Sequence, residues 1–169
     1  MLETPEEITA LQELMDRSHR GASTHLQTIV SGSRRLDASG VLAATTGMKV
    51  LSLATVTAGG EPRISAVDGH FLHGTWTFGT DGGSVKARHL AARPAVSLAH
   101  VDGERCGIFA HGSAHRLIPT DAGYDDTIAH WKAHYGSDPT TWGEDVRMYR
   151  AELTWLVGYG HSSDSDAAN

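Results

Sequence analysis

From Met48 onward the sequence consists mainly of short segments rich in β-branched and apolar residues, bounded by turns. Short turns join antiparallel strands, whereas parallel strands need a helical crossover each time. The pattern therefore predicts a mainly β, antiparallel fold with flanking helices, closed or nearly closed into a barrel. The expected strands are residues 49–57, 63–69, 70–80 (divided by a turn at His73–Gly74), 95–101, 105–118 and 146–160.

Helix signals occur both before the strands and between them. Thr4 as N-cap, Pro5 in the first turn and Glu7 as the partner of a capping box predict a helix at the start of the chain. A second short helix is expected between Asp37 as its cap and Gly47 at its end. Residues 80–94 and 120–136 give two further helices inside the strand region.

The helix over residues 120–136 is expected to have Thr120 or Asp121 as its cap and to end before Gly136. Gly107 and Gly112 are expected to form bulges or bends in the long strand 105–118.

Strand 146–160 alternates, so Tyr149, Ala151, Leu153 and Trp155 are expected on one face and Met148, Arg150, Glu152 and Thr154 on the other. The expected organisation is an N-terminal helical segment (1–47), a barrel domain (48–160) and a disordered tail (161–169).

Charge and cysteine content limit the possible partners. The formal net charge is −6, so nucleic acid is not an expected partner, because phosphate backbones require clustered positive charge. No apolar run is long enough for a membrane helix, and the charged start does not resemble a signal peptide. Cys106 is the single cysteine, which excludes an intrachain disulfide. A cytoplasmic protein is expected.

Residues 80–94, TDGGSVKARHLAARP, have the composition of a phosphate site. A helix that begins near Ser84 has free N–H groups and a partial positive charge in its first turn. Thr80 and Ser84 offer hydroxyls, two glycines allow close approach, and Lys86 and Arg88 supply charge. The alternative is a solvated helix with surface charges. His89 and Arg93 are expected on the surface.

The strand before this helix has one face that suits a ligand. Arg63, Ser65 and Val67 alternate with Ile64, Ala66 and Asp68. A face with arginine and serine is expected to be wet or to contact a ligand. The alternative is an exposed sheet face with a surface arginine.

Three segments together resemble the pyridoxamine 5′-phosphate oxidase-like, FMN-binding split-barrel superfamily. They are LATVTAGGEPRISAV, TWTFGTDGGSVKARHLAARPAVSLAHV and IFAHGSAHRL, within residues 48–118. The resemblance implies a six-stranded split barrel that forms a homodimer, with a flavin or deazaflavin between the subunits. FMN is the expected cofactor, coenzyme F-420 the alternative, and haem, which some relatives bind, a further one.

The resemblance also assigns site residues. Ring contacts fall on Arg63, Ile64, Ser65, Ala66 and Val67, and phosphate contacts on Gly79, Thr80, Ser84 and Lys86. Arg88 matches a basic position of deazaflavin users, and His111 and Trp155 lie near the ring or substrate. Asp68 stands where true pyridoxamine-phosphate oxidases have a lysine, so that particular activity is not expected.

The implied activity is hydride transfer between the cofactor and a small organic substrate. His111 is the candidate catalytic group, with His70 as an alternative, because a histidine titrates near neutral pH. His111 and His115, or His130 and His134, have spacings that suit a metal, but no cysteine or carboxylate cluster completes a site, so no metal is expected. A dimer that binds flavin without catalysis stays open.

Overall fold

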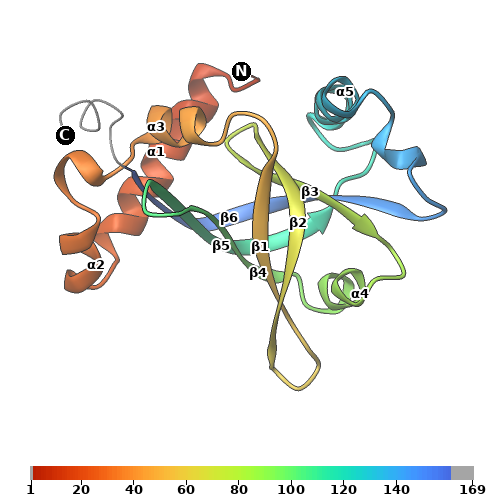
Figure 1. Cartoon of the computed structure of the whole chain (residues 1–169), viewed down its shortest axis with the longest axis horizontal. Coiled ribbons are helices and arrows are strands. Elements are labelled where there is room, and N and C mark those ends of the chain that lie inside the picture. Colours follow the sequence, from red (N-terminus) through yellow and green to blue (C-terminus); the bar gives the residue numbers. More distant parts are fainter. Residues whose placement is uncertain (1, 161–169) are drawn as a thin grey trace.

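The computed structural model describes residues 2–160, which form a β-barrel with helices on its outside (Figure 1). The strands are β1 (Lys49–Val56), β2 (Pro62–Leu72), β3 (Thr75–Asp81), β4 (Ala95–Asp102), β5 (Cys106–Arg116) and β6 (Val146–Gly160). The helices are α1 (Pro5–Arg20), α2 (Thr24–Ile29), α3 (Ala38–Ala44), α4 (Val85–Ala92) and α5 (Tyr124–Tyr135), with short 3-10 turns at Gly32–Arg34 and Pro139–Thr141. The tail predicted at 161–169 lies outside the described residues.

The strands pair in the order β1-β2-β3-β6-β5-β4, and the barrel closes through a pairing of β1 with β4. Every pairing is antiparallel. This confirms the predicted mainly β, antiparallel, six-stranded barrel with flanking helices. The β-hairpin at His73 and Gly74 is also confirmed, with positive φ angles of 56° and 73° at the two turn positions.

The barrel interior is filled by large apolar side chains that alternate along the strands. Leu51 and Leu53 on β1, Leu98 on β4, Ile108 on β5 and Leu156 on β6 are each less than 2% exposed. Burying each such side chain contributes about 1.5–3 kcal/mol. The two-residue period of the sequence therefore becomes an inside and an outside face of one closed sheet.

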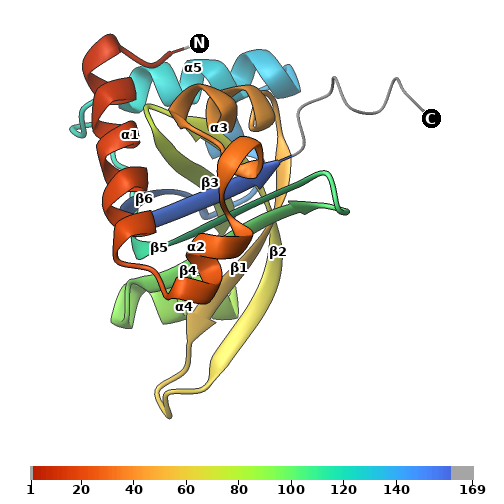
Figure 2. The ribbon, with the colours of Figure 1, turned by 90° about the vertical axis from the view of Figure 1, so that its left-hand side faces the viewer.

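The N-terminal helices pack against the barrel and share its core. Leu11, Leu14 and Met15 of α1 and Val41 of α3 belong to the same buried cluster as the strand residues. Figure 2 shows α1 beside the strands, with α2 and α3 on the same side of the molecule. No helix in residues 2–160 is both long and apolar enough to cross a membrane.

The predicted caps of α1 and α3 are correct, and the predicted cap of α5 is wrong. Thr4 Oγ1 accepts a hydrogen bond from Glu7 N at 3.2 Å, and Glu7 Oε2 accepts one from Thr4 N at 2.8 Å. Asp37 caps α3 through Gly40 N at 2.7 Å. In contrast, neither Thr120 nor Asp121 caps α5.

Helix α5 starts after Gly123, which has a left-handed backbone with φ 71° and offers no side chain as a cap. The Asp121 carboxylate accepts a bond from Ile118 N at 2.9 Å and thus closes the preceding turn instead. The expected end at Gly136 is confirmed, with φ 73°.

The barrel has one register shift, between His111 and Gly112. His111 pairs with Trp155 and Gly112 with Leu153, so the additional residue is Thr154 on β6. Gly107 is not a bulge: it pairs regularly with Tyr159, whose ring lies 2.7 Å from where a Cβ on Gly107 would stand. The predicted bend at Gly112 is therefore confirmed and the one at Gly107 is wrong.

The bulge reverses the faces of β6. Before it, Ala151 lies in the core and is 2% exposed. After it, Leu156 fills the interior and is 0% exposed, while Trp155 lies on the outer face. The predicted grouping of Trp155 with Tyr149 and Ala151 on one face is therefore wrong, because the inserted residue shifts the alternation by one.

Candidate functional site

The first turn of α4 follows directly from the end of β3. Ser84 has an extended backbone and caps the helix by accepting a bond from Ala87 N at 3.2 Å. Thr80 on β3 lies beside it, with 3.2 Å between the two hydroxyl oxygens. The N–H groups of the helical residues Val85 and Lys86 have no carbonyl partner within the helix. Two hydroxyls and these N–H groups thus gather at one point on the surface.

Two glycines before α4 allow β3 and the turn after it to pack closely against β6. Gly82 is buried, and a Cβ there would collide with the carboxylate of Asp145 and the guanidinium of Arg147. Gly79 lies against Met148, whose sulfur would be 3.1 Å from a Cβ. Both glycines therefore serve close packing between β3 and the start of β6.

Basic and acidic groups alternate around this turn. Arg88 Nη1 donates to Gly83 O at 2.6 Å, which holds the exposed guanidinium over the glycine turn. Lys86 is half-buried. The Asp81 carboxylate accepts from Gly83 N at 2.8 Å, so one carboxylate already occupies part of the turn.

Arg147 is a basic residue of this region that the sequence does not indicate. It pairs directly with Thr80 across β3 and β6. Its Nη2 lies 2.5 Å from Asp145 Oδ2, and this hydrogen bond lowers the pKa of the Asp145 carboxyl. Arg147 and Thr80 are more than sixty positions apart in the sequence. Their proximity results from the register of β3 and β6 and cannot be predicted from local sequence patterns.

His89 and Arg93 attach α4 to β1 and are not merely surface residues. His89 Nδ1 lies 3.0 Å from the hydroxyl of Thr55, which is 1% exposed. Arg93 Nε donates to Val56 O at 3.0 Å. These bonds fix the position of the helix against the barrel.

A second group of predicted residues forms a row across the outer face of the sheet. Adjacent strands align Ile64 with Ala54, Ala54 with Ser97, Ser97 with His111, and His111 with Trp155. Residues directly opposite on neighbouring strands point to the same face. Ile64 is 76% exposed, so this face is open at its β2 end.

His111 is held on both sides within this row. Its Nδ1 lies 2.8 Å from Ser97 Oγ. Its ring stacks on that of Trp155, with centroids 4.6 Å apart and an angle of 24° between the planes. The stacking depends on the Thr154 bulge, which turns Trp155 outward. Nε2 has no hydrogen-bond partner among residues 2–160 and is the nitrogen left for a ligand.

The predicted ring-contacting segment of β2 is divided between two faces. Ile64 and Ala66 lie on the outer face, whereas the side chain of Val67 is in the core and 7% exposed. Any contact of Val67 with a cofactor would therefore come from its backbone, not its side chain. Arg63 pairs with Thr55 on the face to which α4 is attached, and its Nη2 bonds Glu61 at 2.8 Å.

His70 does not share the surface position of His111. It is 1% exposed under α5, and its Nδ1 lies 3.0 Å from His130 Nε2. Burial, with further contributions from His130 and His134, lowers the pKa of His70 to about 4. The assumption of a near-neutral pKa that made His70 an alternative acid is therefore wrong.

Histidines of both regularly spaced pairs contact other side chains of the protein: His130 bonds His70, and the ring centroid of His134 lies 4.8 Å from that of His70. His111 bonds Ser97, while His115 bonds Ser113 at 2.9 Å. No group of three or more histidine, cysteine or acidic side chains within residues 2–160 is arranged to hold a metal ion.

Comparisons with solved structures agree on the fold. The haem storage protein HutZ from Vibrio cholerae is 22% identical, with TM-score 0.59, over 68% of this chain and 88% of that chain. An F420 reductase is 21% identical, with TM-score 0.51, over 64% and 88%. A FAD-binding protein from Mesorhizobium loti is 20% identical, with TM-score 0.59, over 77% and 97%. At these identities the likeness concerns the fold alone.

Three further comparisons concern another solved structure, the curated proteins and the family models. A protein of unknown function from Agrobacterium tumefaciens is 22% identical, with TM-score 0.54 over 64% of this chain, but this chain spans only 50% of its length. No curated protein shows a significant match. The family model described as pyridoxamine 5′-phosphate oxidase, in contrast, matches residues 41–156, from within α3 to within β6. The chain therefore belongs to the pyridoxamine 5′-phosphate oxidase family.

Proposed function

We propose that this protein is a flavin-dependent oxidoreductase that binds FMN, with coenzyme F-420 as the alternative, and acts on a small organic substrate. The observation that carries the proposal is the first turn of α4. There the Ser84 and Thr80 hydroxyls lie 3.2 Å apart beside the unpaired N–H groups of the helix. Lys86 and Arg88 supply positive charge next to them. This combination of donors and charge favours a bound phosphate.

The residues present fit a phosphate after two rearrangements. Ser84 can accept from Ala87 N and still donate its hydroxyl proton, because a serine oxygen does both. Arg88 can move from Gly83 O to a phosphate oxygen, since it is exposed. The Asp81 carboxylate must leave the turn, because two anions there would repel each other.

The isoalloxazine ring, in this proposal, lies along the outer face near the row that ends in His111 and Trp155. A bound flavin would supply hydride transfer to or from the substrate. The chain would orient the ring and exclude water. His111, fixed through Ser97, would hold or deliver a proton at Nε2.

The proposal includes a homodimer with the cofactor at the subunit interface. Val50, Ile64 and Val101 are 57%, 76% and 53% exposed on neighbouring strands of the barrel. Large apolar side chains exposed together favour a protein partner. A second copy of the chain would bury them and close the outer face over the ring. The single cysteine fits a reducing, cytoplasmic setting.

Pyridoxamine-phosphate oxidation itself is not part of the proposal. Asp68 is an exposed residue of β2. By the family resemblance, it occupies the position at which oxidases with that activity have a lysine. A carboxylate there repels a substrate phosphate. We therefore propose a substrate that carries no phosphate group.

The decisive experiment measures the binding of FMN, F-420 and haem to the same purified protein. The same affinities are then measured for the double variant Lys86→Ala with Arg88→Ala. Charge-assisted bonds contribute about 1.5–3 kcal/mol each, so the double variant should bind the phosphate cofactor well over tenfold more weakly. The matched control, Arg17→Ala with Lys132→Ala, removes two exposed charges elsewhere and should leave affinity unchanged. Unchanged FMN and F-420 affinity in the first variant would refute the phosphate site, and binding of haem alone would favour a haem protein.

A further inference from the structure

A cavity of about 240 Å³ lies between the second half of α4 and the strands β5 and β6, and is here called the α4 cavity. It is lined by Leu90, Ala91, Pro94, Ala114, His115, Arg116, Arg147 and Tyr149. Among residues 2–160, neither the outer-face row nor the first turn of α4 contributes to this lining. Arg147 borders both the cavity and the glycine turn at Gly82. The cavity is therefore separate from the hydroxyls and N–H groups of the phosphate turn, with Arg147 between the two.

The register of β5 and β6 brings three polar side chains together at this cavity. Arg116 stands directly opposite Tyr149, and Arg147 lies two residues before Tyr149 on the same strand. Residues that are opposite each other, or two apart on one strand, point to the same side of a sheet. This side is the barrel interior, since Tyr149 is 4% exposed and Ala114, two residues before Arg116, is 2% exposed.

The two guanidinium groups leave one positive charge for a ligand. Arg147 donates from Nε and Nη2 to the Asp145 carboxylate, at 3.0 and 2.5 Å, so its charge is compensated. The exposed side chain of Arg116 makes no hydrogen bond or ion pair within residues 2–160, although its charge acts on the Asp145 carboxyl. No acidic side chain lines the cavity in this part of the chain.

The nearest acidic groups on the other side of Arg116 have different partners. Arg116 also borders a second hollow, which Asp121 and Glu152 line. The Asp121 carboxylate accepts from Ile118 N at 2.9 Å, and Glu152 Oε2 lies 3.7 Å from His115 Nε2. The Arg116 guanidinium is thus available to an anion that enters the α4 cavity.

Tyr149 adds a neutral donor, and the rest of the wall is apolar. Burial raises the pKa of Tyr149, with the two guanidinium groups opposing this shift, so the phenol keeps its proton at neutral pH. The Tyr149 ring stacks on that of Phe78, with centroids 5.4 Å apart, which fixes its position. Leu90 and Ala114 are 3% and 2% exposed and form buried apolar wall, while Pro94 is exposed.

We propose that the α4 cavity binds a small monocarboxylate with an apolar body. The carboxylate would accept hydrogen bonds from the Arg116 guanidinium and the Tyr149 hydroxyl, and the body would pack against Leu90 and Ala114. One negative charge matches the one positive charge left on the wall, which a dianionic phosphate would exceed. The cavity is smaller than the usual range of about 300–1,000 Å³ for drug-sized ligands, so its size suits a body of one ring.

The test uses benzoate, its neutral analogue benzamide, acetate and inorganic phosphate near neutral pH. Binding is followed by the backbone amide NMR signals of Ala91 and Ala114, which line the cavity. Benzoate should shift both signals in a saturable way and bind about fivefold or more tightly than benzamide. Acetate, which lacks the ring, should bind more weakly than benzoate, and equimolar phosphate should not displace benzoate.

Two variants identify the donors. Arg116→Gln should weaken benzoate about fivefold or more and leave benzamide unchanged, since a charge-assisted bond at an exposed position keeps part of its strength. Tyr149→Phe keeps the ring on Phe78 and should weaken benzoate about threefold through loss of one hydrogen bond. Arg20→Gln, which changes an exposed arginine at the end of α1, is the matched control and should have no effect.

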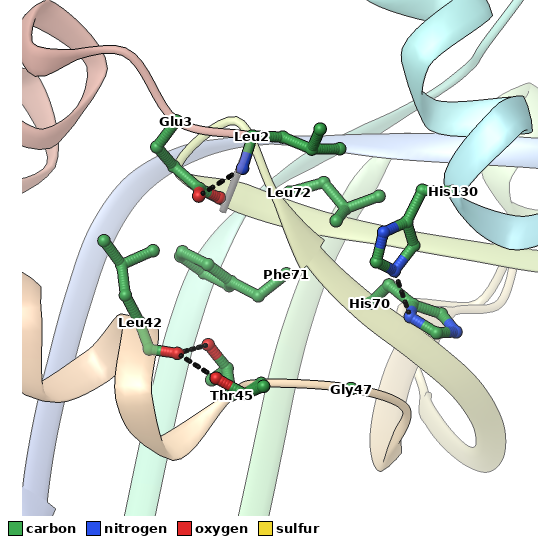
Figure 3. Close-up of a pocket in the computed structure, with 10 residues that line it drawn as sticks. Leu2, Glu3, Leu42, Thr45, Gly47, His70, Phe71, Leu72 and His130 are labelled. Atoms are coloured by element: carbon green, nitrogen blue, oxygen red, sulfur yellow. Dashed lines mark hydrogen bonds between the residues drawn. The ribbon is translucent and has the colours of Figure 1, made fainter. Parts of the chain in front are cut away.

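A different cavity provides a control for location. It lies beside α5, and the hydrogen bond between His70 and His130 forms part of its wall (Figure 3). Gly47 and Leu72 line that cavity, so their amide signals report binding there. Benzoate shifts confined to those two signals would overturn the proposal. Equal affinity for benzoate and benzamide, displacement by equimolar phosphate, or benzoate affinity unaffected by Arg116→Gln would also overturn it.

The proposal does not depend on the flavin site. The Lys86→Ala and Arg88→Ala double variant should bind benzoate as the wild type does, whatever happens to its affinity for FMN. Loss of benzoate binding in that double variant would assign the probe to the phosphate turn and refute a separate site.

Discussion

The buried imidazole of His70 should make the protein lose stability as the pH falls. His70 is 1% exposed and its pKa is lowered from 6.5 to about 4, chiefly by burial. As the pH falls through 6.5, the unfolded chain takes up a proton at this residue, while the folded chain does not until about pH 4. Protons therefore favour the unfolded state across this interval, and the stability present above pH 6.5 is lost below it.

The magnitude follows from these two values. Linkage gives a loss in the free energy of unfolding of about 2 kcal/mol between pH 7 and pH 5, and about 3 kcal/mol by pH 4. His130 adds to the loss in the same direction, since burial lowers its pKa as well. Urea unfolding at pH 7 and pH 5, followed by tryptophan fluorescence, measures the difference directly.

His70→Asn provides the matched variant, because a neutral amide can occupy the position of Nδ1 beside His130 without titrating. The smaller side chain should cost stability at both pH values, but the loss between pH 7 and pH 5 should shrink by about 2 kcal/mol. His25→Asn, at an exposed position of α2, should retain the wild-type loss. An equal pH dependence in wild type and His70→Asn would refute the reasoning.

Two further predictions concern stability. Gly112→Ala should destabilise the protein by about 1–3 kcal/mol in thermal or urea unfolding, because its Cβ would collide with the backbone carbonyl of Glu152 at the bulge. Gly59→Ala, in an open turn, should stay near wild type, and an equal effect at both sites would contradict this account. Thr4→Ala should cost about 1 kcal/mol through loss of the α1 capping box, whereas Thr4→Ser keeps the hydroxyl and should lose little; equal losses would argue against the cap.

Local patterns were sufficient to predict most of the secondary structure. The two-residue alternation of Leu51 and Leu53 identifies a strand whatever its partner is, because it reflects one buried face. The caps Thr4, Asp37 and Ser84 were predictable for the same reason, since each bonds a backbone N–H only three residues away. The cap of α5 was not, because a left-handed glycine replaced a polar side chain.

The structure brings only some of the predicted site residues together. Thr80 and Ser84 lie together because they are four residues apart at a strand–helix junction. The segment of β2 that was predicted to contact the ring is divided between two faces, since the Val67 side chain enters the core while that of Ile64 remains outside. The contacts of Trp155 could not be predicted, because one additional residue at Thr154 reverses the alternation from which its face was inferred.

The sequence by itself determined the order of the elements, the antiparallel class and the local capping signals, all of which depend on neighbours within a few residues. Tertiary structure alone decided that Arg147 stands beside Thr80 and that His70 meets His130 under α5. The residues of each pair are 60 or more positions apart. No local periodicity encodes the strand register that joins Arg147 to Thr80, or the packing of α5 that joins His130 to His70. The closed barrel fixes that register, because each strand must bury one face and pair both of its edges.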